Sequence, residues 1–391
     1  MIIALWISLF IVAYTFVGYG FLLYFIIKIK RTFKGKPVLP VVSDEALPSC
    51  TLVVAAYNEE HFIAAKIANT LQLKYPEGKL KFIFVTDGSS DNTAEIISQH
   101  PQIQLLHRPG RAGKIAAVHR AMEYVDTEVV VFTDANTFLN AEAITRICRH
   151  YSDKTVGAVA GEKRVQIDQS ADASAAGEGF YWKYESALKK WDSELYSVVG
   201  AAGELFSVRR NLYQDVPADT VLDDFMISML IASQGYRIIY EPEAYALETA
   251  SENVAEELKR KIRIAAGGIQ SIVRLKSLLL PFKFPILSFQ YVSHRVLRWT
   301  VTPFFLILAF ITNFATAFAG DGVIYTLLFA GQVVFYSLSL LGYVMEKRHI
   351  RIKALFIPYY FCVMNYAVMA GIIRYFTKKQ SAVWEKAQRK M

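Results

Sequence analysis

Four long apolar stretches constrain the fold of this chain more strongly than any other feature of its sequence. Residues 2–27 contain no charged side chain, and Lys28, Lys30 and Arg31 follow at once. A helix needs about 20 such residues to cross a hydrocarbon core. Three further apolar stretches occupy residues 300–318, 323–344 and 354–373. The sequence therefore predicts a membrane protein whose long middle segment lies outside the bilayer.

The composition agrees with this interpretation and excludes several other classes. Of the 391 residues, 53% are hydrophobic and only 20% are charged, whereas soluble proteins carry about 25% charged residues. So much apolar side chain excludes an intrinsically disordered chain. The three cysteines, Cys50, Cys148 and Cys362, are few and far apart, which excludes a disulfide framework and a cysteine-rich metal site.

Basic residues gather beside the apolar stretches and predict the orientation of the chain. The net charge is +8, and close to half of the 43 lysines and arginines lie within residues 28–36, 259–276, 347–353 and 374–390. Clusters of this kind are typical of cytoplasmic loops. We therefore expect a multi-pass protein of the inner (plasma) membrane with its middle segment in the cytoplasm. No basic groove with interleaved aromatic residues is present elsewhere, so nucleic-acid binding is not expected.

The two ends of the chain allow alternative interpretations. A cleaved signal peptide would need basic residues before the first apolar stretch and a small-residue cleavage site after it, and the sequence has neither. At the other end, a full crossing by residues 354–373 would place the basic tail outside, against the positive-inside rule. Either this stretch is re-entrant or interfacial, or the tail breaks the rule, and we favour a cytoplasmic tail.

The middle segment, residues 48–250, has the pattern of an α/β domain. Short apolar runs at 51–55, 82–85 and 128–132 predict buried strands, and 59–72, 93–99 and 114–124 predict helices between them. Alternating strands and helices indicate a mostly parallel sheet covered on both faces. Such sheets bind ligands beyond the carboxyl ends of their strands, so the functional residues are expected there.

Polar residues do follow these strands. Tyr57 and Glu59 come after the first, Asp87 after the second, and Asp134 and Asn136 after the third. An acid in such a place can accept a hydrogen bond from a ribose hydroxyl or a base, and two oxygen-bearing side chains two residues apart can bind Mg²⁺ or Mn²⁺ together with substrate phosphates. Ordinary turn and cap chemistry is the alternative for each segment taken singly.

Two further groups carry possible chemistry. Asp223 and Asp224 precede an apolar helix at 226–232, where one of them could be a general base or both could favour the helix N-terminus. Arg295, Arg298 and Trp299 lie at the predicted membrane boundary. There they could anchor the chain in the interface, or bind a diphosphate and line a sugar site.

Taken in order, these motifs resemble those of the membrane-embedded family 2 glycosyltransferases, which have the GT-A fold. That family carries three aspartate motifs followed by a (Q/R)-x-x-R-W motif. They correspond here to Asp87, to Asp134-Ala135-Asn136, to Asp223-Asp224, and to Arg295-Val296-Leu297-Arg298-Trp299. The resemblance covers about residues 51–299, and its specificity comes from four motifs in the same order.

The resemblance implies a role for each matching residue. Donor binding is implied for Tyr57, Glu59, Asp87, Lys114, Asp134 and Arg298, and metal binding for Asp134 and Asn136. Asp224 matches the catalytic base and Asp223 the acid before it. Acceptor binding is implied for Glu204, Arg295 and Trp299, and Trp384 in the tail resembles the tryptophan of a gating segment. Asn136 stands in place of the usual second aspartate, and Arg295 stands where polysaccharide polymerases most often have glutamine.

The predicted fold class is therefore α/β, with a cytosolic, Rossmann-like GT-A domain between transmembrane helices. The expected parts are an N-terminal membrane helix (1–27), a basic linker (28–47), the GT-A domain (48–250), amphipathic interface helices with the R-x-x-R-W motif (251–299), C-terminal membrane helices (300–376) and a basic tail (377–391).

The predicted function is inverting transfer of a sugar from a UDP-sugar to a growing β-linked polysaccharide, with a divalent metal, Mg²⁺ or Mn²⁺, as cofactor. Transfer of a single sugar to a lipid-linked acceptor is the alternative, because glycolipid synthases such as ceramide glucosyltransferase have the arginine form of the last motif. A non-catalytic nucleotide-sugar-binding subunit is a third hypothesis. The sequence leaves open the sugar, the linkage and any partner for export.

Overall fold

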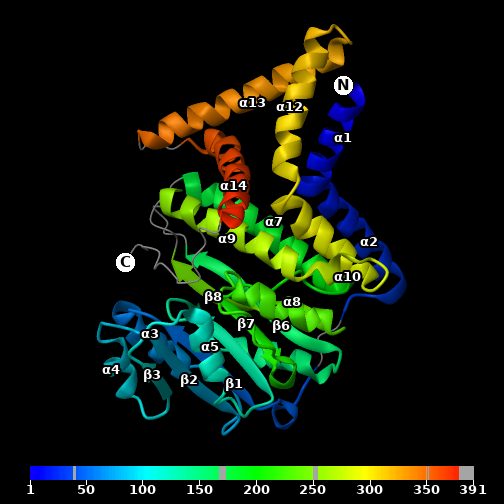
Figure 1. Ribbon diagram of the computed structural model, residues 1–391. Helices are drawn as coiled ribbons and strands as arrows, with labels where there is room; N and C mark the ends of the chain where they lie inside the picture. The colour runs from blue at the N-terminus through cyan, green and yellow to red at the C-terminus, as the bar shows by residue number, and fades with distance from the viewer. Residues whose placement is uncertain (38–40, 167–172, 250–253, 349, 351, 378–391) are drawn as a thin grey trace.

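The computed structural model describes residues 1–37, 41–166, 173–249, 254–348, 350 and 352–377. Trp384, the predicted gating residue, lies outside the described residues. A sheet with its covering helices forms one end of the molecule, and long apolar helices form the other (Figure 1). A layer of helices between the two ends positions the candidate site.

One eight-stranded sheet organises the first end, in the order β3-β2-β1-β4-β7-β6-β8-β5. Its strands are β1 (Cys50–Ala56), β2 (Leu80–Asp87), β3 (Gln104–Arg108), β4 (Val129–Asp134), β5 (Phe138–Leu139), β6 (Val156–Gln166), β7 (Leu205–Arg209) and β8 (Arg237–Thr249). Strands β1 to β4 are parallel, as expected. Strand β7 runs antiparallel to both β4 and β6, and β5 runs antiparallel to β8. Strand β6 pairs in parallel with β8, so four of the seven strand pairings are parallel and the sheet as a whole is mixed.

The apolar residues of the central strands are buried on both faces of the sheet, which explains their continuous apolar runs. Val53 and Val130 pack on one face with helices α5 (Lys114–Met122) and α8 (Asp223–Ser233). Their neighbours Leu52 and Val131 pack on the other with α3 (Glu60–Leu71) and α6 (Ala143–Arg149). A short helix, α4 (Thr93–Ser98), follows β2. Alternate residues of each strand thus anchor opposite layers of helices.

The register brings the carboxyl ends of β1, β2 and β4 to one edge of the sheet. Ala55 lies opposite Val85 of β2 on one side and opposite Asp134 of β4 on the other. Asp87 and Asp134 are the last residues of their strands. The side chains that follow these strands therefore gather at one edge, as the sequence predicts.

The apolar stretches form long helices at the other end. The first is continuous from α1 (Ile2–Ala13) through a π-helical turn (Tyr14–Gly18) to α2 (Tyr19–Lys34). It lies beside α12 (Thr302–Phe318), and α13 (Val323–Lys347) and α14 (Lys353–Phe376) follow (Figure 1). Among the described residues, three helices are long and apolar enough to cross a membrane. A fourth span results if the bent pair 285–299 and 302–318 counts as one.

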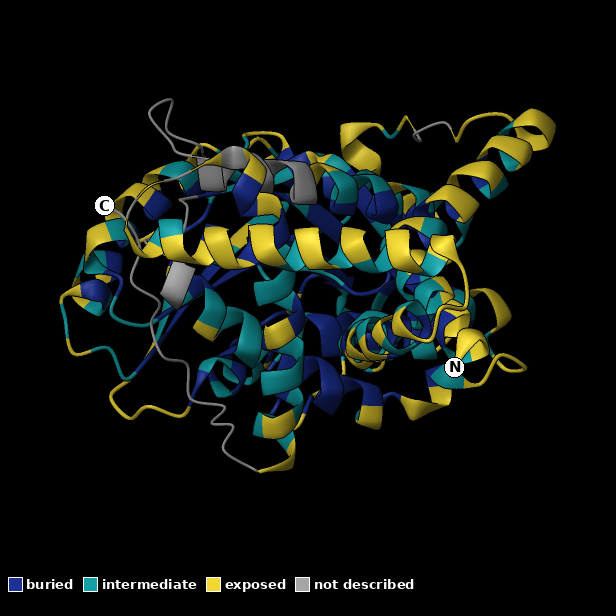
Figure 2. Ribbon diagram, turned by 90° about the horizontal axis from the view of Figure 1, so that it is seen from above, coloured by how far each residue is buried: buried dark blue, intermediate teal, exposed yellow. Residues whose placement is uncertain are grey.

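Exposed apolar side chains cover the outer sides of these helices. Figure 2 looks down on this end of the molecule, and the exposed residues lie on the outside of the long helices with the buried residues beneath. In α13 only Ser339 and Gly342 are buried. An apolar outer surface of this kind is the expected lipid-facing side of a membrane helix.

Helices α7 (Ala173–Leu195), α9 (Val254–Arg274) and α10 (Pro285–Tyr291) form the layer between the sheet and the apolar helices (Figure 1). Helix α10 continues through a π-helical turn (Val292–Val296) into the short α11 (Leu297–Trp299). The predicted amphipathic interface segment, 251–299, contains α9, which ends at Arg274, and a short 3₁₀ turn (Lys276–Leu279) follows it. Helix α14 packs directly on α9.

Candidate active site

The predicted donor-binding residues at the ends of β1 and β2 lie close together. The Asp87 carboxylate accepts hydrogen bonds from the backbone N–H groups of Ala112 and Gly113, with Oδ2 distances of 3.0 and 2.6 Å. The guanidinium of Arg111, in the same loop, lies 3.9 Å from the centre of the Tyr57 ring. Asp87 thus fixes the loop before α5, and Arg111 and Tyr57 form its polar edge.

Glu59 stands at the start of α3 and is buried. Its backbone N–H donates to Thr93 Oγ1 at 2.8 Å, which links the loop after β1 to the loop after β2. The preceding Asn58 has a φ of 52°, in the left-handed region that asparagine tolerates better than most residues. The turn is therefore sharply bent, and it brings Glu59 beside the start of α4. The binding roles of Tyr57, Glu59 and Asp87 remain predictions.

A lysine at the first position of α5 joins the acidic motifs. Lys114 Nζ donates to Asp134 Oδ1 at 2.8 Å and lies 3.7 Å from Asp223 Oδ2. Burial alone would lower the pKa of Lys114, but the negative charges of Asp134 and Asp223 outweigh it and raise that pKa above its usual value. Lys114 is therefore a fixed cation between the predicted metal-binding turn and the predicted base.

The turn after β4 has oxygen atoms suited to a divalent cation. The Oδ1 atom of Asn136 is buried and accepts no hydrogen bond among the described residues. Asp134, two residues earlier, offers a carboxylate, and one of its oxygens accepts a hydrogen bond from Lys114. No cluster of three or more His, Cys, Asp and Glu side chains suited to a metal occurs in the described part of the chain. The donor set therefore fits a cation that takes its remaining ligands from substrate phosphates.

Lys66 supports this turn from behind, and the sequence analysis did not single it out. It is fully buried on α3, and its Nζ donates to Thr133 Oγ1 at 3.2 Å and to the Thr137 carbonyl at 2.7 Å. Burial lowers the pKa of Lys66 to about 7. The sequence did contain a signal for this role. Lys66 lies on the helix face that also carries Ile63 and Ile67, and a lysine among buried apolar positions needs polar partners.

The two adjacent acids Asp223 and Asp224 lie in the first turn of α8, not ahead of the helix as predicted, and they point to different places. Asp223 Oδ2 lies 3.7 Å from Lys114 Nζ, whereas Asp224 lines a cavity and also interacts with the charge of Lys114. Burial, together with the negative charge of Asp223, raises the pKa of Asp224 to about 7. Asp224 can therefore exchange a proton with a group in the cavity near neutral pH.

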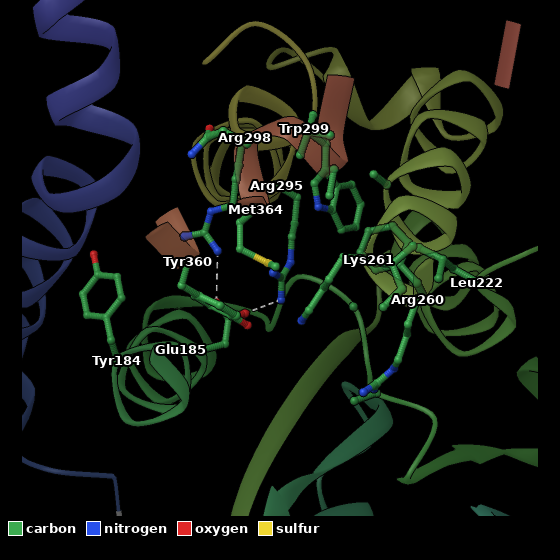
Figure 3. A pocket seen from close by; sticks show the side chains of 18 of the residues that line it. Tyr184, Glu185, Leu222, Arg260, Lys261, Arg295, Arg298, Trp299, Tyr360 and Met364 are labelled. Atoms are coloured by element: carbon green, nitrogen blue, oxygen red, sulfur yellow. Dashed lines mark hydrogen bonds and ion pairs between the residues drawn. The ribbon is translucent and has the colours of Figure 1, made fainter. Parts of the chain in front are cut away.

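The cavity has a volume of about 450 Å³ and extends from Asp224 to the apolar helices. Its lower part is charged, and Lys189, Glu204, Arg260 and Lys261 line it beside Asp224. Its upper part is apolar and is formed mainly by one face of α14, with Phe356, Ile357, Phe361, Met364 and Val368. Figure 3 shows the Arg295 and Arg298 side chains extending into the space from α11 and the turn before it.

Both arginines of the R-x-x-R-W motif contact one acid, Glu185 of α7. Arg295 Nη2 donates to Glu185 Oε1 at 2.5 Å, and Arg298 Nη1 donates to Glu185 Oε2 at 3.2 Å (Figure 3). Burial alone would raise the pKa of Glu185, but Arg295, His294 and Arg298 outweigh it and hold that pKa well below its usual range. The sequence analysis missed Glu185, because nothing in the pattern of its helix connects it to a motif 110 residues away.

Trp299 and Glu204 also lie at the cavity, where acceptor binding was predicted. The Trp299 ring packs edge-on against the ring of Phe225, the residue that follows Asp224, with ring centres 5.4 Å apart. Glu204 Oε1 accepts from Lys163 Nζ at 2.7 Å and lies 3.6 Å from Arg260 Nη2. Trp299 thus forms a wall beside Asp224, while the Glu204 carboxylate is engaged in an ion-pair network. Acceptor contacts of either residue remain a prediction.

Comparison with known proteins gives consistent similarities. Residues 51–216 match the family model described as "Glycosyl transferase family 2". The chain is 26% identical over 287 residues to the poly-β-1,6-N-acetyl-D-glucosamine synthase of Staphylococcus aureus, which covers 71% of this chain and 68% of that protein. It is 25% identical over 262 residues to the Staphylococcus epidermidis protein of the same name, covering 65% and 62%.

A solved structure is similar over almost the whole chain. The mannosyltransferase PcManGT from Pyrobaculum calidifontis, in complex with GDP-Man and Mn²⁺, has a TM-score of 0.71 and 25% sequence identity. The similarity covers 96% of this chain and 99% of that one, so it includes the apolar helices. The predicted α/β GT-A fold, with apolar helices that could cross a membrane on both sides of it, is confirmed.

Proposed function

We propose that this chain, which belongs to the family 2 glycosyltransferases, transfers a sugar from a UDP-sugar to a growing β-linked polysaccharide with inversion at the anomeric carbon. The observation that carries the proposal is the cavity that begins at Asp224 and continues to the apolar helices. It offers a path on which an acceptor hydroxyl reaches a carboxylate whose pKa is near 7. The similarity to poly-β-1,6-N-acetyl-D-glucosamine synthase supports a polysaccharide product.

The donor is expected at the carboxyl ends of β1, β2 and β4. Tyr57, Glu59 and Asp87 would hold the nucleoside, and Lys114 and Asp134 lie where a diphosphate would follow. The similarity to a poly-β-1,6-N-acetyl-D-glucosamine synthase favours UDP-N-acetylglucosamine as the donor of this chain, and the family resemblance makes UDP-glucose the next candidate. PcManGT was solved with GDP-Man, so a guanosine donor belongs in the same test.

Asp224 would be the general base. It would take the proton from the acceptor hydroxyl as that oxygen attacks the anomeric carbon, and the bond from this carbon to the diphosphate would break on the opposite side. A single displacement of this kind inverts the configuration and needs no covalent intermediate. Trp299, packed beside Asp224 through Phe225, would hold the acceptor sugar against the base.

The leaving UDP would be stabilised by cationic side chains. Arg298 lines the cavity and Lys114 borders Asp134, and both present positive charge where the diphosphate departs. Asp134 and Asn136 would hold Mg²⁺ or Mn²⁺, which supplies further positive charge for the diphosphate. Stabilisation of charge that develops only in the transition state raises the catalytic rate rather than substrate affinity alone.

The proposed location of the catalytic domain is the cytoplasmic face of the membrane. The basic residues that follow the first apolar helix and those that precede α14 support this orientation. UDP-sugars are made in the cytoplasm, so a donor site on this side would have direct access to them. An amphipathic α9 with three basic residues in sequence, Lys259 to Lys261, suits the membrane surface between the two parts.

Transfer of one sugar to a lipid acceptor is the second candidate, and the apolar upper wall of the cavity favours it. Phe356, Ile357, Phe361 and Val368 of α14 offer an acyl or prenyl chain a continuous apolar surface. The charged lower part would then hold the head group of the lipid. A long polysaccharide would instead need polar or stacking contacts along this wall, for which Tyr360 and Asn365 are available.

The test is to give the purified protein, in lipid nanodiscs, radiolabelled UDP-N-acetylglucosamine, UDP-glucose and GDP-mannose with Mg²⁺ or Mn²⁺. Label in a long lipid-free polymer would support the polysaccharide synthase and identify its donor. Label that stays in organic-soluble lipid would support the second candidate. Nucleotide binding without incorporation into either product would contradict both and support a binding subunit.

A further inference from the structure

We propose that Glu185 is a positioning residue that holds the arginines of the R-x-x-R-W motif at the cavity until a donor diphosphate takes Arg298 from it. The inference rests on the proposed function, because it concerns how the same site receives the diphosphate. It assigns a role in the reaction to a residue outside every motif of the sequence analysis.

One carboxylate serves both guanidinium groups, with one oxygen for each. Glu185 Oε1 accepts from Arg295 at 2.5 Å, and Oε2 accepts from Arg298 at the longer distance of 3.2 Å. Glu185 is only 2% exposed, yet it lines the cavity together with both arginines. Lys189, Arg260 and Lys261 line the same cavity, so its basic side chains outnumber its acidic ones, Glu185, Glu204 and Asp224. An anion that enters the cavity is therefore attracted to it.

The carboxylate is held from behind, so the arginine is the group that moves. His294 Nε2 lies 3.3 Å from Glu185 Oε1, and its Nδ1 lies 2.6 Å from Asp192 Oδ2. Asp192 in turn accepts from the Tyr19 hydroxyl at 2.5 Å and from Gln290 Nε2 at 3.0 Å. All of these groups are buried. Glu185 is thus backed by a buried network that reaches the first apolar helix, with His294 Nε2 in close contact but outside hydrogen-bond geometry.

The two arginines differ in their distance from Glu185, and this difference points to the one that exchanges. Two contacts keep Arg295 in place. One is its short hydrogen bond to the buried Glu185 carboxylate, and the other is with the Trp299 ring, whose centre lies 5.7 Å from the guanidinium. Arg298 has the longer contact and belongs to the last turn before the bend at Thr300. A diphosphate offers Arg298 a stronger partner than one shared carboxylate, because it carries more charge and more acceptor oxygens. Arg295 then remains with Glu185 and neutralises it.

A second ion pair on the same helix provides the comparison. Arg31 of α2 contacts Glu194 of α7 at 2.6 Å, and neither residue lines the cavity. That pair joins two helices and has no substrate to exchange with. Both glutamates thus lie on α7 and pair with arginines of other elements, but only Glu185 lines the cavity.

The experiment measures UDP affinity in the presence of Mg²⁺ by calorimetry, and kcat for sugar transfer, in the full-length protein in nanodiscs. Glu185→Gln removes the competitor of the diphosphate for Arg298, so UDP should bind about threefold or more tightly. The same change leaves Arg298 poorly oriented in the transition state, so kcat should fall about tenfold or more. Glu185→Asp should recover part of the rate, and Glu194→Gln should change neither quantity.

Tighter product binding combined with slower turnover is a result that a purely structural role would not give. Unchanged or weaker UDP binding by folded Glu185→Gln protein, beside an active wild type, would overturn the inference. If this variant does not fold, the double variant Glu185→Gln, Arg295→Gln removes one charge of each sign and decides by the same criterion. A wild type that neither binds UDP nor transfers sugar would instead refute the proposed function, and the inference with it.

Discussion

The ammonium of Lys114 lies 2.8 Å from a carboxylate oxygen of Asp134 and so connects the end of β4 to the start of α5. The same ammonium lies 3.7 Å from Asp223, in the first turn of α8. One cation therefore links the turn that would hold the metal to the acid pair that would supply the base. Asp224 lines the cavity and is still near enough to Lys114 for that cation to lower its pKa, so the acid pair lies between the proposed donor residues and the cavity.

We expect Asp224→Asn to reduce sugar transfer by about 10²- to 10⁴-fold, the usual contribution of a general base. UDP binding should stay nearly unchanged, because Asp224 is proposed to act on the acceptor hydroxyl and not to hold the nucleotide. Initial rates with labelled donor and calorimetry with UDP measure the two quantities. The matched control is Asp126→Asn, at an exposed aspartate that pairs with Lys81. Loss of UDP binding in the Asp224 variant would count against its assignment as the base.

The pH dependence should follow the protonation of Asp224. A base works only when deprotonated, and burial together with Asp223 raises the pKa of Asp224 to about 7. kcat/KM should therefore be highest above pH 7 and fall about tenfold for each pH unit well below it. A profile between pH 5.5 and 8.5 measures this limb. An activity that stays constant down to pH 5.5 would contradict the assignment.

Two neighbouring substitutions should move that limb in opposite directions. Asp223→Asn removes a negative charge that raises the pKa of Asp224, so the limb should shift to lower pH. Lys114→Met removes a positive charge that lowers the same pKa, so the limb should shift to higher pH. Shifts in the same direction for both variants would show that another group controls the profile.

Asp134→Ala should weaken both the donor and the metal response, because it removes the carboxylate of the proposed metal-binding turn. KM for the nucleotide sugar and the Mn²⁺ concentration at half-maximal rate should each rise about tenfold or more. Asn136→Ala should have the same effect to a smaller degree, since an amide oxygen is a weaker ligand than a carboxylate. Titration of Mn²⁺ at fixed donor measures both variants. An unchanged metal response in Asp134→Ala would refute the proposed role.

Parts of this site were predictable because the ends of the buried strands can be recognised in the sequence. Asp87 and Asp134 close short β-branched runs, and these runs do form adjacent parallel strands whose carboxyl ends meet. The antiparallel strand β7 was not predicted as a strand, and its pairing with β4 depends on α7 and β6 between them. Local periodicity cannot report a pairing of that kind.

The Glu185 contacts were not predictable for a related reason. Arg295 and Glu185 are 110 positions apart, and only the packing of α7 against the turn before α11 brings them together. Likewise, the resemblance implied that Arg298 binds the donor diphosphate, whereas the structure also gives it a protein partner. Residue types in a motif predict the chemistry, and tertiary packing decides which neighbours share it.

The close approach of α9 to Trp299 makes a fifth prediction. A Cβ atom added at Gly268 would lie 2.6 Å from the Trp299 ring, so Gly268→Ala must displace the indole or the helix. Displacement of the proposed acceptor wall should lower kcat for transfer by about tenfold to a hundredfold, with UDP binding little changed. The control is Gly331→Ala in α13, where an added Cβ meets nothing within 4 Å. Equal activity of the two variants would argue against a role for Trp299 at the acceptor.

The central claim is that the chain transfers a sugar with inversion, using Asp224 at the end of the cavity. Its most direct test is an NMR time course with ¹³C-labelled, α-linked nucleotide sugar and the protein in nanodiscs. The account predicts a new β-anomeric signal in the product that grows as the donor signal falls, and that is absent with Asp224→Asn. A product with the α configuration, or equal product formation by the Asp224 variant, would contradict it.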